Sequence, residues 1–266
     1  MKKVIINADD FGYSSGVNRG ILESFKNGLL TSTTLMANMP GASEAIELAK
    51  AYPALGVGCH LVLTCGCPLT KGQTIASDGR FYNLQTYQEK RSTMDEEEIF
   101  EEWCTQIDFL LDQGMTLTHL DSHHHVHTFP ENLAITQRIS ERYQLPFRNA
   151  YGLEEALSLN YQLGITGFLD LMNYPAIRDI THSFENRKDE CLKELQAVLD
   201  QLKDHEVTEL MVHPAFVDEE LYYHSSFNIG RIKEVAILCD ETVSQMFQEN
   251  GIQLYHYGNI GDMEKG

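Results

Sequence analysis

Long apolar runs are missing from this sequence of 266 residues, and none approaches the roughly 18 residues that a membrane-spanning helix needs. The first residues, MKKVIINADDFG, contain only a short apolar stretch before acidic residues begin, and they contain no small-residue cleavage site. Such a beginning is not typical of a secretory signal peptide. We therefore expect a cytoplasmic protein with no part in a membrane.

Paired cysteines are missing as well, because the six cysteines are scattered and form no CxxC motif. In a chain of this length that pattern indicates free thiols in a reducing compartment. Basic residues are scarce: 20 lysines and arginines stand against 39 acidic residues, which gives a net charge of −19. This charge would repel a phosphate backbone, so we expect no nucleic-acid partner.

The chain has no linker rich in proline, glycine or serine, no low-complexity tract and no internal repeat; instead, strand-like and helix-like segments alternate. The apolar patterns predict strands near residues 3–8, 31–38, 55–63, 117–127, 146–150, 209–213 and 252–260. They predict helices near residues 15–28, 43–52, 95–114, 131–143, 192–202 and 231–250. Residues 64–94 form a less regular insert with a turn at Asp78-Gly79, and residues 151–185 are ambiguous.

Repeated strand–helix units favour one parallel sheet covered by helices, either open or closed into a barrel. The length is compatible with a single domain over residues 1–266, which we expect. In both architectures the chemistry gathers beyond the carboxyl ends of the strands. The residues at those ends are therefore the first candidates for a functional site.

Aspartate or histidine stands at the carboxyl end of four predicted strands. Asp9 and Asp10 end the first strand, and His60 lies near the end of the third. His123 ends the histidine-rich strand, and His213 ends the strand 209–213. Any one of these residues alone would be weak evidence, but their convergence on one edge predicts a site there.

The stretch LTHLDSHHHVHTF, residues 117–129, contains five histidines. In an extended strand, alternate side chains share a face, so residues 119, 121, 123, 125 and 127 would point the same way. Neighbours on that face lie roughly 6.5 Å apart. At most one or two of these histidines could therefore hold the same ion, and other segments must supply the remaining ligands.

Two imidazoles and one carboxylate, with open positions, suit Zn²⁺, Fe²⁺, Co²⁺, Ni²⁺ or Mn²⁺, whereas Mg²⁺ prefers oxygen ligands. An ion held in this way polarises a carbonyl group and acidifies its bound water. A second carboxylate can take the proton of that water, and a histidine on the opposite wall can protonate the leaving group. These parts suit the hydrolysis of an amide or an ester.

Four motifs, NADDFG (7–12), GCHLVLT (58–64), THLDSHHHVHTFP (118–130) and VHPAF (212–216), resemble those of the YdjC-like carbohydrate deacetylases, in the same order. This family includes the chitooligosaccharide deacetylases. The resemblance implies a distorted, incomplete (β/α) barrel of mostly parallel strands. It also implies a hydrolase that removes N-acetyl groups from small amino sugars or chitooligosaccharides with one divalent ion, commonly described as magnesium.

Carried over residue by residue, the resemblance makes Asp10, His60 and His123 the metal ligands. It places Asp9 at the general base and His213 at the general acid. Which of the two adjacent aspartates is the base and which is the ligand stays open at this point.

Three further residues receive roles around this set. His125 is the rival metal ligand on the face of His123, and Asp121 could orient a ligand imidazole. Arg148 could pair with the base carboxylate and keep it ionised, or it could form a surface salt bridge. Tyr222 and Tyr223 could stack on a sugar ring or pack against a second subunit, which leaves a homodimer open.

Three alternatives stay open. A metal phosphoesterase would use basic residues to bind phosphate, and the motifs contain almost none. A two-carboxylate glycosidase would cleave the glycosidic bond and would be indifferent to chelators. A metal- or sugar-binding protein without turnover would leave the additional acid and base unexplained.

Overall fold

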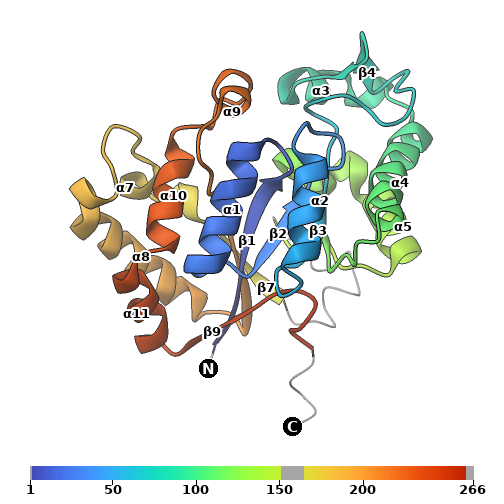
Figure 1. The fold of residues 1–266 in the computed structure, drawn as a ribbon. Coiled ribbons are helices and arrows are strands. Elements are labelled where there is room, and N and C mark those ends of the chain that lie inside the picture. Colours follow the sequence, from blue (N-terminus) through green and yellow to red (C-terminus); the bar gives the residue numbers. More distant parts are fainter. Residues whose placement is uncertain (1, 151–164, 262–266) are drawn as a thin grey trace.

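A computed structural model describes residues 2–150 and 165–261. Within this part of the chain, seven strands form one curled sheet in which all strand pairs are parallel (Figure 1). The strands of this sheet are β1 (Lys2–Phe11), β2 (Ser32–Leu35), β3 (Gly56–Leu61), β6 (Leu120–Ser122), β7 (Ile165–Asp170), β8 (Val207–Val212) and β9 (Ile252–Tyr255). The order is β6-β3-β2-β1-β8-β7, with β9 beside β1, and no pairing joins β6 to β7 among the described residues. The expected incomplete (β/α) barrel is confirmed.

The central strand is β1, which is long enough to have three neighbours. Residues 3–8 pair with β8, residues 2–5 pair with β9, and residues 7–11 pair with β2. Because the β9 and β2 partners do not overlap, these two strands share one edge of β1 while β8 occupies the other. The carboxyl end of β1 therefore lies in the middle of the sheet.

Helices flank the sheet, and several begin where the sequence predicts. They are α1 (Ser15–Asn27), α2 (Ala42–Ala51), α4 (Glu96–Asp112), α5 (Leu133–Tyr143), α7 (Pro175–Arg178), α8 (Lys188–Leu202), α10 (Gly230–Leu238) and α11 (Glu241–Glu249). Ser14 caps α1 by accepting a hydrogen bond from the backbone of Val17. The single helix expected over residues 231–250 is wrong, because Asp240 accepts the backbone N–H groups of Thr242 and Val243 and begins a new helix.

The insert and the short helix α9 (Glu219–His224) lie over the carboxyl ends of the strands, at the top of Figure 1. The insert contains α3 (Leu84–Lys90) and a hairpin of β4 (Ala76–Ser77) and β5 (Arg80–Phe81). Its predicted turn is confirmed, with φ values of 51° at Asp78 and 74° at Gly79. Positive φ at both central residues matches a type I′ turn.

Two buried polar residues of α4 fasten the insert to the barrel. Glu102 accepts the backbone N–H groups of Leu69 and Thr70, at 3.0 and 2.8 Å. Gln106 exchanges two hydrogen bonds of 2.8 Å with the backbone of Val62, directly after β3. The insert is therefore anchored beside the strand that contains His60.

The expectation of one extended histidine-rich strand is wrong beyond Ser122. Strand β6 ends there, and residues His123–Thr128 form a 3-10 turn, η2. His124 and His125 have φ values of 57° and 53°, a left-handed conformation that cannot continue a strand. The shared face predicted for residues 119–127 is consequently broken after residue 122.

Two other expected segments also differ. In place of a strand at residues 146–150, Phe147 forms a single parallel bridge with Leu120. The backbone N–H of Arg148 donates to Leu120 O at 2.7 Å, which holds this segment beside β6. Of the ambiguous stretch 151–185, residues 151–164 lie outside the described part, and β7 lies in the remainder. Within the described residues, no helix is long and apolar enough to cross a bilayer.

Candidate metal centre and active site

Asp9 and Asp10 reach the same cavity through an irregularity at the end of β1. In a regular strand, adjacent side chains point to opposite faces. Here Asp10 has a φ of 69°, and the pairing with β2 shifts register between Ala8 and Phe11. Aspartate tolerates this left-handed conformation better than most residues, and a shift of this kind redirects a side chain. Both carboxylates consequently line one cavity of about 560 Å³.

The carboxylate of Asp10 is the meeting point of two imidazoles from different elements. Its Oδ1 lies 3.3 Å from Nε2 of His60, on β3, and 3.0 Å from Nδ1 of His123, the first residue of η2. The three potential ligand atoms all lie within 4.8 Å of one another. One carboxylate and two imidazoles are thus gathered as a metal centre with open positions requires.

A second carboxylate fixes the orientation of the His60 imidazole through the ring nitrogen that does not face Asp10. Its Nδ1 lies 2.7 Å from Oδ1 of Asp121, and Thr34 donates to Oδ2 of the same carboxylate at 2.9 Å. Nε2 is buried and has no hydrogen-bond partner among the described residues. A carboxylate that holds one ring nitrogen and directs the other toward a common point is the usual arrangement behind a metal-bound histidine.

A second group, Asp9, His60 and Asp121, also satisfies the distance condition for a metal site. The carboxylate oxygens of this group already have partners. Arg148 donates to Asp9 and lies 3.0 Å from Asp121, and Asp121 also accepts a hydrogen bond from Thr34. The group around Asp10 fits an ion better.

Charge in the cavity favours a cation at Asp10. Burial lowers the pKa of His60, but Asp121 and Asp10 outweigh it and raise the pKa to about 10. The pKa of His123 is likewise raised well above its ordinary value, although burial opposes this, with Asp10 among the causes. A place that favours protonated imidazoles also favours a divalent ion, which displaces those protons when it binds.

Asp9 is held by a buried guanidinium. Arg148, completely buried, bonds to both oxygens of Asp9, one of them at 2.7 Å. Burial would raise the pKa of Asp9, but the charge and hydrogen bonds of Arg148 hold it well below the ordinary value. Arg148 also donates to Glu209 at 2.8 Å. Of the two interpretations of Arg148, the pairing with Asp9 is observed and the surface salt bridge is wrong.

His213 follows β8 on the opposite side of the cavity. Its Nε2 lies 3.9 Å from Oδ2 of Asp9, and its backbone N–H donates to the buried carboxyl of Glu234. The ring meets that of Phe227 edge to face, with centroids 5.4 Å apart. Burial lowers the pKa of His213 to about 4, although Asp9 opposes this. His213 is therefore neutral near pH 7 and has to gain a proton before it can donate one.

The other histidines of the histidine-rich segment are placed differently. His125 lines the cavity but does not belong to either group of converging ligand atoms. His124 lies 2.9 Å from Thr64 through Nδ1. His127 is completely buried, 2.6 Å from Ser122 Oγ, and stacks on Phe147. Of this segment, the structure brings only His123 to Asp10.

Two buried charged residues of the site, Arg231 and Glu209, were not predicted from the sequence. Arg231 of α10 donates to Oδ2 of Asp10 at 2.7 Å and is 2% exposed. Arg231 precedes Val235 by four residues and Leu238 by seven, so it lies on the apolar face of its helix. Glu209 interrupts the apolar strand β8. A charged residue at an apolar position is a readable signal of a buried ion pair.

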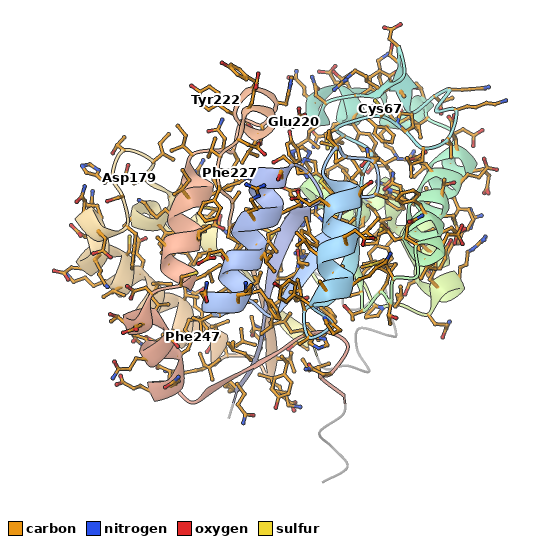
Figure 2. The ribbon with its side chains drawn as sticks, in the orientation of Figure 1. Cys67, Asp179, Glu220, Tyr222, Phe227 and Phe247 are labelled. Carbon is orange, nitrogen blue, oxygen red and sulfur yellow. The ribbon has the colours of Figure 1, made fainter. Side chains whose placement is uncertain are left out.

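A second cavity of about 620 Å³ adjoins the first. The two share five lining residues: Tyr13, Thr64, Cys65, Asn83 and His224. The second cavity lies between the insert and α9, which contribute Cys67 and Glu220 (Figure 2). The metal-ligand cluster therefore lies at one end of a longer groove.

The chain is similar to several known proteins. The family model described as YdjC-like protein matches residues 3–249. A carbohydrate deacetylase of Geobacillus stearothermophilus is 38% identical over 253 residues, covering 95% of this chain and 96% of that protein. A carbohydrate deacetylase of Brevibacillus brevis is 37% identical over 261 residues, covering 97% of this chain and 100% of that protein.

Two solved structures are also similar. A protein from Enterococcus faecalis, described as a cellobiose-phosphate cleavage protein, has a TM-score of 0.83 and 31% identity, covering 97% of this chain and 98% of that one. The catalytic domain of a peptidoglycan N-acetylglucosamine deacetylase from Eubacterium rectale has a TM-score of 0.51 and 11% identity, covering 96% of this chain and 88% of that one. The second likeness concerns the fold alone.

Proposed function

The chain belongs to the YdjC-like family, and from that premise we propose a metal-dependent hydrolase that removes an N-acetyl group from a small amino sugar or chitooligosaccharide and releases acetate. The expectation of an enzyme of the carbohydrate deacetylase type, acting on an amide bond, is confirmed by the curated relatives. The observation that carries the mechanism is the meeting of His60 and His123 at Asp10, with Asp9 and His213 beside them.

Asp10, His60 and His123 would hold one divalent ion. The ion would polarise the acetyl carbonyl and acidify a water molecule. Two imidazoles and one carboxylate suit Zn²⁺, and also Co²⁺, Ni²⁺ or Mn²⁺, better than Mg²⁺, which prefers oxygen ligands. Asp121 keeps His60 in the tautomer that presents Nε2 to the ion.

Asp9 is the proposed general base. Arg148 holds its carboxylate in one orientation and keeps it ionised, so that it can accept a proton from the attacking water. The same contact weakens the basicity of Asp9. The water must therefore be acidified for this transfer to proceed at neutral pH, which is why a base of this kind needs an ion beside it.

His213 is the proposed general acid. Its Nε2 lies 3.9 Å from Asp9, so the proton that Asp9 takes from water would reach it through one water molecule or after a small approach of the two side chains. Protonated His213 would then donate this proton to the amine nitrogen as the bond between that nitrogen and the acetyl carbon breaks. One proton thus passes from water to the leaving amine. The products are the free amino sugar and acetic acid, which loses its remaining proton to give acetate.

The shape of the groove supports an oligosaccharide in addition to a single sugar. A cavity of about 560 Å³ surrounds the cluster, and the adjoining cavity of about 620 Å³ has room for a further ring. Asn83 and Phe81 contribute an amide and an aromatic ring to its lining, groups that suit sugar hydroxyls and sugar rings, whereas Asn38 uses its amide nitrogen to hold the backbone carbonyls of Cys65 and Cys67. We propose that chitooligosaccharides lie along both cavities.

The test is acetate release from di-N-acetylchitobiose and a panel of N-acetylated mono- and disaccharides, before and after chelation and with each metal added back. Metal-dependent acetate from any of these sugars supports the proposal. Acetate release that survives proven removal of the metal contradicts the metal mechanism. No acetate from any sugar, with an ion firmly bound, contradicts the proposed substrate class.

The same assay separates the alternatives. A glycosidase releases new reducing ends and no acetate, and the product mixture distinguishes the two directly. A phosphoesterase needs cations beside the ligand cluster that are available to phosphate. Arg148 and Arg231, which lie there, are each bonded to a carboxylate, and Arg80 lines the adjoining cavity. A binding protein gives no product at all.

We also propose a homodimer and a cytoplasmic location. Tyr222 and Tyr223 of α9 are 50% and 70% exposed, as surface aromatics for a second copy would be, and Tyr222 lies at the rim in Figure 2. Light scattering coupled to size exclusion would give the mass of the particle. A monomer that stays a monomer at high concentration contradicts the dimer.

A further inference from the structure

Arg231 bonds to a single oxygen of Asp10, the carboxylate proposed as a metal ligand. Its Nη2 donates to Oδ2 of Asp10 at 2.7 Å, while Oδ1 of the same carboxylate faces His60 and His123. The two oxygens therefore have separate partners. A carboxylate divided in this way offers one oxygen to an ion.

The guanidinium is itself held in place. Its Nε donates to the backbone carbonyl of Phe227 at 2.7 Å, and its Cζ lies 5.1 Å from the centroid of the Phe227 ring. The side chain is only 3% exposed, so exchange of its partners with water is restricted. Two nitrogens at fixed positions in a planar group give a direction that a lysine ammonium cannot reproduce.

Arg231 also places charge beside the ligand. Its guanidinium brings a positive charge to within 2.7 Å of the Asp10 carboxylate. This positive charge is a cost for a nearby cation, so Arg231 would not be expected beside the centre if affinity alone mattered. The contact is instead explained by its effect on the orientation of the Asp10 carboxylate.

We propose that Arg231 is a positioning residue that holds Asp10 as a one-oxygen ligand and so keeps positions of the ion free for water and substrate. Two-oxygen binding by Asp10 would occupy a position that the reaction needs. The inference rests on the proposed metal site, and it adds a residue from α10 that the four sequence motifs do not contain.

The test compares ion binding by the full-length wild type, Arg231→Lys and Lys233→Met, by calorimetry with Zn²⁺ and with Co²⁺. Arg231→Lys keeps the charge but loses the planar donor group that aims Oδ1 of Asp10 at the two imidazoles, so we expect affinity to fall roughly tenfold or more, as for other groups that orient metal ligands. Lys233 is the matched control: it is a buried cation of the same helix that bonds to the carbonyls of Ala176 and Asp179. Lys233→Met should bind the ion as the wild type does.

The crystal structure of the ion-loaded wild type gives an answer that does not depend on how a variant folds. We expect Oδ1 of Asp10 on the ion and Oδ2 still on Arg231. Both oxygens on the ion, with Arg231 displaced, would overturn the inference, as would unchanged affinity in a folded Arg231→Lys protein. No ion binding by the wild type would overturn the proposed metal site together with this inference, so the two failures are distinguishable.

Discussion

Two neighbouring aspartates of β1 are each bonded to an arginine, and the two surroundings differ. Arg148 is shared among Asp9, Asp121 and Glu209, and each of its three nitrogens has a partner within the barrel. Arg231 bonds to one oxygen of Asp10, and its Nη1 has no partner among the described residues. Asp9 belongs to a saturated buried network, whereas Asp10 keeps an oxygen open toward two imidazoles.

This difference gives a physical reason for assigning different roles to the two aspartates. A carboxylate whose two oxygens are both bonded to a guanidinium is a poor metal ligand, but its orientation is fixed, as a base requires. A carboxylate with one oxygen open can bind an ion. Adjacency in the sequence alone leaves the two roles interchangeable, and the arginine contacts favour Asp9 as base and Asp10 as ligand.

Removal of the ligand should have the largest effect. Asp10→Asn replaces the charge on which His60 and His123 converge, so ion affinity should fall by more than the roughly 100-fold seen for outer partners of a ligand. Calorimetry with Zn²⁺ measures this, and acetate release should disappear at ordinary ion concentrations. Retention of a tightly bound ion by folded Asp10→Asn would contradict the ligand assignment.

Removal of the base should affect turnover and spare the ion. Asp9→Asn keeps the shape of the side chain, and kcat for acetate release should fall roughly 10²- to 10⁴-fold, the usual contribution of a general base. Ion affinity should stay within a few-fold of the wild type. If Asp9→Asn loses the ion and Asp10→Asn keeps it, the two roles are reversed.

Much of the fold could be predicted because strand and helix patterns are local. The segment 15–28, bounded by a serine and a glycine, becomes α1, and Asp78-Gly79 becomes the predicted turn. Positions set by backbone conformation could not be predicted in this way. The left-handed residues His124 and His125 end a strand that the alternation of residues would continue.

The residues of the site likewise fall into those that could be predicted from the sequence and those that could not. Asp10, His60 and His123 could be brought together in advance, because parallel strands end at one edge and the resemblance identified which histidine of the run to choose. Arg231 comes from a helix 221 residues further along the chain, with no motif to connect it to Asp10. Long-range ion pairs of this kind depend on the packing of helices against strands, which local patterns do not contain.

Removal of Arg148 should show how much the saturated network matters to stability. Arg148→Met leaves Asp9, Asp121 and Glu209 without their shared cation, and loss of one partner of a buried ion pair typically costs about 3–5 kcal/mol. Urea denaturation gives the change in free energy of unfolding. Arg138→Met is the matched control, because that arginine pairs with Glu97 at the exposed surface and should contribute far less. Equal losses in both variants would contradict the comparison.

A pH-dependent effect is expected at Glu234, beside Arg231. Burial raises the pKa of Glu234 from 4.5 to about 8, so the folded protein keeps this proton over a range in which the unfolded chain has lost it. Unfolding then releases a proton, and the contribution of this group to stability falls as pH rises from about 5 to about 8, by at most about 1.4 kcal/mol per pH unit. The Glu234→Gln side chain has no carboxyl proton to lose, so the stability of this variant should fall less steeply over that pH range. Denaturation at several pH values measures the difference. Parallel curves for the two proteins would mean that Glu234 is already ionised in the folded state, and that Arg231 stabilises a second carboxylate in addition to Asp10.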